Sequence, residues 1–193
     1  MPAPKFFVIA RVVGRDRAMA LSSRQALRVV TKESMANFGS MGKWKERLVH
    51  LCGVSATEPH GDSYYWGEDL DGEPDTLWGL EGYTHPIGFF IDHISSDIFK
   101  REMALVDKDE LLKHQQGLGS PDYDLHHYDK ESGWLKRDDD PDRDCKTSYV
   151  AIHHFWATSE KNRTDVLGAL SAFAADARNE QPRGVQSCLV LRE

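Results

Sequence analysis

The fold is decided by residues 58–100, which read EPHGDSYYWGEDLDGEPDTLWGLEGYTHPIGFFIDHISSDIFK. The stretch opens on a Pro-Gly turn at 58–61, and the aromatic run that follows at 63–69 favours a strand. Residues 71–75 (DGEPD) are typical of a hairpin turn. A second strand is therefore expected over 76–83, next to the first.

A helix is expected directly after this hairpin, because Pro86 suits the first helical turn. Apolar residues recur there at steps of three and four, as they do on the buried face of a helix. This stripe consists of Phe89, Phe90, His93, Ile94 and Ile98. The pattern places His93 inside the stripe, facing the sheet. Residues 107–114 could add a short helix or a strand.

The N-terminal part supplies a further strand and helices. Residues 6–13 are β-branched and aromatic and stop at Gly14, which indicates a largely buried strand. Helical spacing follows over 16–36, then a glycine-rich break at 38–42, then helical spacing again over 44–52.

The C-terminal part begins with a polar connection, residues 115–146, rich in Gly, Pro and Asp. Such a segment is either a lid or binding loop, or a solvated insertion. The pattern then restarts with a strand over 149–156, a helix over 162–178 and a strand over 185–191. The expected packing face of that helix is Val166, Leu167, Leu170 and Phe173.

The chain contains a weak internal repeat. The turn Gln181-Pro182-Arg183-Gly184 resembles the turn at 58–61, and each precedes a strand. The order strand, helix, X-Pro-X-Gly, strand thus occurs twice, the second time truncated. We expect three parts: an α+β repeat over 1–114, the polar insertion over 115–146, and a truncated β-α-β repeat over 147–193 that packs on the same core.

Composition excludes several classes of function. The 193 residues carry 24 Lys and Arg against 31 Asp and Glu, a net charge of −7 without a basic block, which disfavours nucleic-acid binding. Cys52, Cys145 and Cys188 have no CxxC spacing, which argues against a disulfide framework and a structural zinc site. No apolar run approaches the ~18 residues of a membrane span, and Arg11 interrupts the N-terminal run. We expect a soluble, cytoplasmic protein without membrane contacts.

Four motifs in residues 48–100 together resemble the antibiotic biosynthesis monooxygenase family. They are the turn Glu58-Pro59-His60-Gly61, the strand at 63–66, the strand ending Glu81-Gly82-Tyr83, and the helix with His93, Ser96 and Phe99. The resemblance implies a ferredoxin-like α+β unit with an antiparallel sheet and helices on one face. It also implies that two sheets close into a dimeric α+β barrel and that the protein is a homodimer. The wording of 78–83 and the partial second copy are similar to fungal members linked to secondary metabolism.

Strand alternation selects the candidate catalytic residues. Leu77, Gly79, Glu81 and Tyr83 share one face of their strand, with Trp78 and Leu80 on the other. If that face looks towards the helix, Glu81 and Tyr83 converge with His93, which could act as a general base. The alternative is a core histidine bonded to Glu81 or to a backbone carbonyl. On the late strand His153 and His154 point apart, and His154 is favoured as a fourth catalytic candidate because Trp156 shares its face.

A flat aromatic ligand would suit the aromatic walls near the glycines of the strand-to-helix corner. The same side chains could equally be core packing. The candidate substrate-binding residues are Trp66, Trp78, Phe89, Phe90, Trp156, His153 and His85.

No metal or cofactor is expected. His126, His127 and Asp129, with the aspartates at 138–140, lie in the polar connection, and adjacent histidines of an extended chain point apart. No GxGxxG, P-loop, GxSxG or HExxH motif occurs. The resemblance also brings haem degradation into question, since members of the wider fold with that activity use an Asn on the first strand. The strand expected at 6–13 contains no Asn, which disfavours this activity.

The resemblance implies a cofactor-independent monooxygenase that oxidises a polycyclic phenol or anthrone-type polyketide with O2. Two alternatives remain open from the residues. One is a cyclase, dehydratase or isomerase of a polyketide or terpenoid intermediate that uses the same pocket without O2. The other is a non-catalytic barrel protein that binds a small molecule.

Overall fold

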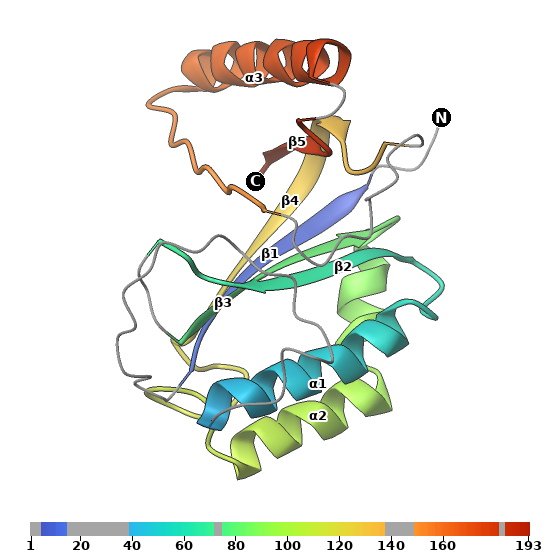
Figure 1. Ribbon diagram of the computed structural model, residues 1–193, viewed down its shortest axis with the longest axis vertical. Helices are drawn as coiled ribbons and strands as arrows, with labels where there is room; N and C mark the ends of the chain where they lie inside the picture. Colours follow the sequence, from blue (N-terminus) through green and yellow to red (C-terminus); the bar gives the residue numbers. More distant parts are fainter. Residues whose placement is uncertain (1–4, 15–38, 72–74, 138–148, 182–183) are drawn as a thin grey trace. The chain divides into compact units, whose positions relative to one another are not determined.

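The computed structural model describes residues 5–14, 39–71, 75–137, 149–181 and 184–193 (Figure 1). The chain forms two compact units. The first comprises residues 1–127 and 146–150, and the second comprises residues 128–145 and 151–193. The expected helix over 16–36, Cys145 and the aspartates at 138–140 lie outside the described residues.

The first unit holds most of the regular structure. Its elements are β1 (Phe6–Val13), α1 (Gly39–Ser55), β2 (Gly61–Glu68), β3 (Thr76–Tyr83), the π-helix η2 (Gly88–His93) and α2 (Asp97–Lys108). The strand β4 (Tyr123–Trp134) begins in the first unit and ends in the second, which also holds α3 (Glu160–Glu180) and β5 (Cys188–Arg192). The bounds of β1 and β3 coincide with those expected from the sequence.

The five strands form one sheet in the order β2-β3-β1-β4-β5. The pairs β1–β3, β2–β3 and β4–β5 are antiparallel. The fold is therefore α+β with an antiparallel sheet, which confirms the expected class and is consistent with a ferredoxin-like unit. Among the described residues, no helix is long and apolar enough to cross a membrane.

The register of the first three strands decides which side chains face the helices. Glu81 lies opposite Val8 on one side and Tyr64 on the other. These positions share the sheet face on which α1 and α2 pack side by side (Figure 1). The main core joins this face to both helices through Val12, Trp44, Leu48, Leu51, Leu77, Met103 and Val106. A smaller cluster joins it to η2 through Phe6, Val8, Tyr83 and Phe89.

The glycine-rich stretch at 38–42 is not the break that the sequence predicts, since α1 begins at Gly39. The first turn of a helix tolerates glycine because its N–H groups have no partner within the helix in any case. Packing favours the longer helix: Met41 and Trp44 both contact the main core.

The helix expected after Pro86 is two helices. The amide of Ile94 donates to the carbonyl of Phe89, the five-residue spacing of a π-helix, at 3.1 Å. A new helix, α2, then starts at Asp97, and the hydroxyl of the N-cap residue Ser96 accepts from the amide of Phe99. The predicted apolar stripe is consequently split, because Phe89 and His93 are buried whereas Phe90 is 43% exposed.

Residues 107–114 form neither of the expected elements. The helix α2 continues to Lys108, and Leu112 then makes only an isolated bridge to Gly14. Leu111 and Leu112 are both buried in the main core. Burial of these two side chains, rather than a regular element, explains the apolar pattern.

The polar connection at 115–146 contains β4, so the prediction of a long loop was wrong. Within β4 only Trp134 is fully buried. Its sequence, YDLHHYDKESGW, also lacks the alternation of apolar and polar residues by which strands are recognised. The carboxylate of Asp122 fixes the turn before β4, accepting from the amides of His114 and Gln115 and from the hydroxyl of Ser120.

The expected strand at 149–156 is not formed, and its aromatic side chains are largely exposed. The helix α3 confirms the one expected over 162–178, but its buried side is shifted. Leu167 and Leu170 pack together with Ala174 and Ala177, whereas Val166 and Phe173 are exposed. The last strand, β5, is shorter than the range 185–191 that we expected. The second unit thus holds the end of β4, followed by α3 and β5.

Arg137 anchors the C-terminal end of α3 in the second unit. Its guanidinium donates to the carbonyl oxygens of Arg178 (2.8 Å), Ala177 (3.2 Å) and Val185 (2.8 Å). It also lies 5.1 Å from the centre of the Trp134 ring. A cation at this position bonds carbonyl oxygens of the last helical turn and complements the helix dipole.

We predict that Gly79→Ala destabilises the first unit by about 1–3 kcal/mol. A Cβ at Gly79 would lie 2.6 Å from the indole ring of Trp66, which is too large to move aside cheaply. Urea denaturation measures the change. Gly53→Ala is the control, since a Cβ there has nothing within 4 Å in the helix α1. It should stabilise by about 0.5–1 kcal/mol. Equal effects of the two substitutions would contradict the packing of Trp66 over Gly79.

Candidate functional site

A buried ion pair between His93 and Glu58 forms the centre of the candidate site. The Nδ1 atom of His93 lies 2.9 Å and 3.1 Å from the two carboxylate oxygens of Glu58. His93 ends the π-helix η2, and Glu58 lies in the turn before β2. The side chain of His93 is 1% exposed and that of Glu58 is 6% exposed. Both side chains are therefore almost completely removed from water.

The turn reaches η2 because of the hairpin register. Gly61 at the start of β2 pairs with Tyr83 at the end of β3. The amide of Thr84 then donates to the carbonyl of His60 at 2.9 Å, which holds the turn against the start of the helical segment. Glu58 is thus brought to the corner where the chain leaves the sheet.

A second polar pair lies on the sheet beneath His93. The hydroxyl of Tyr83 donates to the Oε2 atom of Glu81 at 2.8 Å, and both residues are buried. The ring of Tyr83 lies 6.2 Å from that of His93. The face of β3 that carries Glu81 and Tyr83 looks towards the helices, which is the condition under which the sequence places them near His93.

Aromatic rings surround His93. Its ring lies 5.5 Å from Tyr64 of β2, 6.5 Å from Phe89 of η2 and 5.1 Å from Phe99 of α2. Tyr64 and Phe99 pack against the main core, and Phe89 belongs to the smaller cluster. The polar residues therefore occupy the junction of the two hydrophobic clusters, an environment of low dielectric in which charge interactions are strong.

The pKa values of the cluster are shifted in directions that follow from this environment. Burial alone would lower the pKa of His93, but the hydrogen bond that its Nδ1–H donates to Glu58 and the charges of Glu81 and Glu58 outweigh burial and raise it. Burial raises the pKa of Glu81, and the proximity of His93 opposes that rise. Burial and the charge of Glu81 raise the pKa of Tyr64 and of Tyr83. Both phenols therefore stay protonated at neutral pH.

The Nε2 atom of His93 is buried and has no hydrogen-bond partner among the residues that the structure describes. Because Nδ1 faces the Glu58 carboxylate, the neutral ring keeps its proton on Nδ1 and presents a lone pair at Nε2. Unsatisfied polar atoms in a protein interior are uncommon and call for an explanation. The arrangement can accept a proton at Nε2 from a molecule placed beside it.

The remaining candidate residues are distributed over several places. Trp66 lies on the helix-facing side of the sheet, over Gly79. Trp78 lies on the opposite side, where its indole N–H donates to Asp69 at 2.7 Å, so it does not face His93. His85 is exposed, and its Nδ1 accepts from the amide of Ile87.

Three candidates belong to the second unit and are described with it. They are His153, His154 and Trp156, all from the segment expected to be a strand. The rings of His154 and Trp156 stack at 5.8 Å, which agrees with their assignment to one face. The site around His93 is built from residues of the first unit alone.

Glu58 is the residue that the sequence analysis missed. The sequence indicates only a turn at Glu58, and it offers Glu81 or a backbone carbonyl as the partner of His93. The register of the hairpin would have predicted the contact. When Gly61 pairs with Tyr83, the turn before β2, which holds Glu58, lies beside η2, which follows β3.

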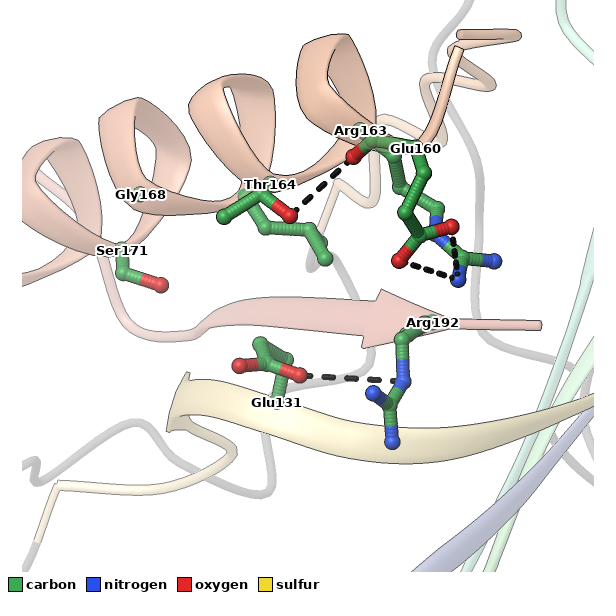
Figure 2. A pocket seen from close by; sticks show the side chains of 8 residues that line it. Glu131, Glu160, Arg163, Thr164, Gly168, Ser171 and Arg192 are labelled. Atoms are coloured by element: carbon green, nitrogen blue, oxygen red, sulfur yellow. Dashed lines mark hydrogen bonds and ion pairs between the residues drawn. The ribbon is translucent and has the colours of Figure 1, made fainter.

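A separate pocket of about 370 Å³ lies in the second unit between α3 and the strands β4 and β5 (Figure 2). Four charged side chains line it and form two pairs. Arg163 lies 2.7 Å from Glu160, and Arg192 lies 3.8 Å from Glu131. Since each charge already faces an opposite one, the pocket offers less to a charged ligand than its arginines suggest. In the described part of the chain no group of three or more His, Cys, Asp and Glu side chains could hold a metal ion.

Comparison with known proteins identifies similar structures but no family. No family model and no curated protein matches the chain. Protein SO0527 from Shewanella oneidensis has a TM-score of 0.44 and 15% identity, with 66% of this chain and 92% of that chain covered. Rv0793 from Mycobacterium tuberculosis has a TM-score of 0.41 and 20% identity, covering 64% and 91%.

A third similar structure comes from Bacteroides thetaiotaomicron VPI-5482, a conserved protein of unknown function described as a possible oxidoreductase. Its TM-score is 0.41 and its identity 12%, with 67% of this chain and 99% of that chain covered. Likenesses at this level carry no conclusion about function.

We predict that Glu58→Gln lowers the pKa of His93, because it removes the charge and weakens the hydrogen bond that raise it. A folded-state pKa above the unfolded value of about 6.5 means that protonation of His93 stabilises the fold. That contribution is complete below pH 6.5 and is lost as the pH rises through the raised value. The variant should therefore lose about 1–3 kcal/mol at acidic pH and less at alkaline pH.

NMR titration of the His93 imidazole and urea denaturation at two pH values measure these effects. Glu46→Gln is the control, since it removes the same charge from an exposed position of α1. A loss of stability that is independent of pH would show that Glu58 acts through packing alone.

Proposed function

We propose that the protein is a cofactor-independent oxygenase that deprotonates a polycyclic phenol or anthrone-type substrate and lets O2 oxidise the anion. The observation that carries the proposal is the unpartnered, buried Nε2 atom of His93 in a ring that Glu58 holds through Nδ1. A carboxylate on one nitrogen fixes the tautomer and increases the basicity of the other.

The first step is proton transfer. Nε2 of His93 removes a proton from the acidic C–H or O–H group of the substrate, and the ring becomes an imidazolium paired with Glu58. The raised pKa of His93 makes it a stronger base than an ordinary histidine. The rate should rise with pH as the free ring becomes neutral.

The second step uses the substrate as the reductant. The carbanion gives one electron to O2, and the resulting radical pair combines to a substrate peroxide. Loss of a second proton from the same carbon, with cleavage of the O–O bond, forms a C=O group and water. A CH2 group and O2 thus become C=O and H2O, and the four electrons come from the substrate.

The other residues of the cluster supply orientation and a water-poor environment. Glu81 accepts a hydrogen bond from the hydroxyl of Tyr83. The Tyr83 hydroxyl proton is therefore already donated within the protein, and the ring is held beside His93. The hydrophobic clusters on either side exclude water, which protects a carbanion from reprotonation.

A line of aromatic rings supports entry from the side of η2. Phe90 is 43% exposed and lies 5.1 Å from Phe89, whose ring stacks on His93 at 6.5 Å. The ring of Phe90 also contacts Phe6 at 5.9 Å and His127 at 5.2 Å. A flat apolar substrate would exchange these ring contacts for its own as it approaches His93.

Oxygen uptake by purified, metal-free protein with a panel of anthrones and hydroquinones tests the proposal. Wild-type protein should consume O2, His93→Ala should lose at least a hundredfold in rate, and Glu58→Gln should shift the rising limb of the pH profile to lower pH. The exposed-site variant Glu46→Gln should behave as wild type.

Other outcomes distinguish the alternatives. Substrate conversion without O2 uptake would indicate a cyclase, dehydratase or isomerase that uses the same base. Uptake that His93→Ala leaves unchanged would exclude His93 as the base. Tight binding of the panel without conversion would indicate a binding protein.

We predict that Phe90→Ala speeds modification of His93 by diethyl pyrocarbonate, which attacks a neutral imidazole. Removal of the outer ring opens the line Phe90-Phe89-His93, so the rate should rise severalfold, followed by mass spectrometry of the His93 peptide. Ile91→Ala is the matched control on η2, since Ile91 is 60% exposed and has no ring in this line. Equal rates in the two variants would contradict entry beside Phe90.

A further inference from the structure

The two adjacent histidines of β4 lie on opposite sides of the sheet, within the first unit. The strands β1 and β4 are neighbours, and the ring of His127 stacks on that of Phe6 at 5.8 Å with 17° between the planes. Phe6 belongs to the smaller cluster on the helix-facing side, so His127 lies on that side too. His126 points the other way, because side chains alternate along a strand. Its Nε2 atom lies 3.0 Å from the carboxylate of Asp124.

The ring of Phe90 lies among three other rings, one of which is the imidazole of His127. Its centre is 5.9 Å from that of Phe6, 5.1 Å from that of Phe89 and 5.2 Å from that of His127. Phe90 is 43% exposed, so moving its ring into water costs less than moving a buried one. Of the rings that contact Phe90 in the described part of the chain, only the imidazole can form a hydrogen bond. A ligand ring in place of Phe90 would therefore meet two apolar rings and one polar ring.

Phe89 connects this place to His93. Its ring lies 5.5 Å from that of His127 and 6.5 Å from that of His93. Both imidazoles thus border the same phenyl ring, and the two separations together do not exceed the length of a flat molecule of three fused rings with oxygen substituents. With its reacting carbon beside Nε2 of His93, such a molecule extends past Phe89 far enough for an outer ring to reach His127.

We propose that His127 determines the specificity of this site, by a hydrogen bond to a hydroxyl or carbonyl oxygen on an outer ring of a flat polycyclic substrate. That outer ring takes the place of the Phe90 side chain. The inference rests on the proposed function because it concerns the other end of the same substrate. It involves binding alone, however, and needs no reaction with O2.

The surroundings of His127 favour discrimination between ligands. Its Nε2 atom is buried, and the rings of Phe6, Phe89 and Phe90 lie around the imidazole. A hydrogen bond is stronger in such apolar surroundings than in water. A site that supplies one distinguishes ligands that carry the matching group from ligands of the same shape that lack it. The apolar rings contribute affinity for any flat ligand, whereas His127 contributes the preference for an oxygen substituent.

Binding of two quinones to the full chain, measured by quenching of tryptophan fluorescence, tests the proposal. The probes are anthraquinone and a dihydroxyanthraquinone with one hydroxyl on each outer ring, away from the carbonyl groups. Both are already oxidised, so neither consumes O2. Wild-type protein should bind the dihydroxy compound about tenfold more tightly. His127→Phe keeps a ring but removes both nitrogens, so it should abolish this preference and leave the dissociation constant of anthraquinone nearly unchanged. His127→Gln keeps a donor and an acceptor and should retain most of the preference.

His126→Phe is the matched control, the same substitution one residue away on the other side of the sheet, and should leave both dissociation constants unchanged. Circular dichroism verifies that each variant is folded. Equal loss of affinity for both quinones in His127→Phe would show that His127 acts through packing and would overturn the proposal. An unchanged preference in that variant, or a wild type that binds neither quinone, would overturn it as well.

The O2 uptake assay separates this inference from the proposed function. A wild-type preference that His127→Phe abolishes, without O2 uptake from any anthrone or hydroquinone, would refute the oxygenase and leave the role of His127 standing. Uptake by a protein that lacks the preference would refute the role of His127 and leave the oxygenase standing.

Discussion

The contact between Glu58 and His93 is the constraint on which the helix-facing side of the first unit depends. A histidine with 1% exposure cannot remain there as an uncompensated cation, and a buried carboxylate needs a donor just as much. Each side chain therefore offsets the free-energy cost of burying the other. Their meeting fixes the turn before β2 against the end of η2, and thereby the corner where sheet and helices join. Glu81 and Tyr83 can be buried at that corner because His93 and Glu58 are both present and bonded to each other.

Much of the first unit could be predicted from local patterns. The bounds of β1 and β3 coincide with the expected ones because their composition and their flanking turns agree. The face of β3 that carries Glu81 and Tyr83 follows from alternation alone. Burial of His93 was also predictable from helical spacing, although that prediction assumed one continuous helix where the structure has η2 and α2.

The failures share a physical origin, since they occur where the partner of a residue lies far away in the sequence. Glu58 reaches His93 across 35 positions, and no local pattern records that distance. The strand β4 was missed because its pairing with neighbours outweighs a polar sequence that leaves most of its side chains unburied. At 149–156 the opposite happened: the segment has strong strand propensity but forms no strand in the described part of the chain. Local propensity indicates which secondary structure a segment can form, whereas long-range contacts determine whether that structure forms.

The π-helix η2 has a consequence for how this fold could diverge. Its bond from Ile94 to Phe89 spans one residue more than an α-helix requires, so η2 accommodates a single extra residue within one turn. Deleting one residue would let the turn close as an α-helix and rotate everything before it by about 100° relative to α2. The side chains that precede the deleted position would then take a different position relative to the imidazole. Inserting or deleting one residue in η2 would therefore change the side chains around His93 more than a single substitution would.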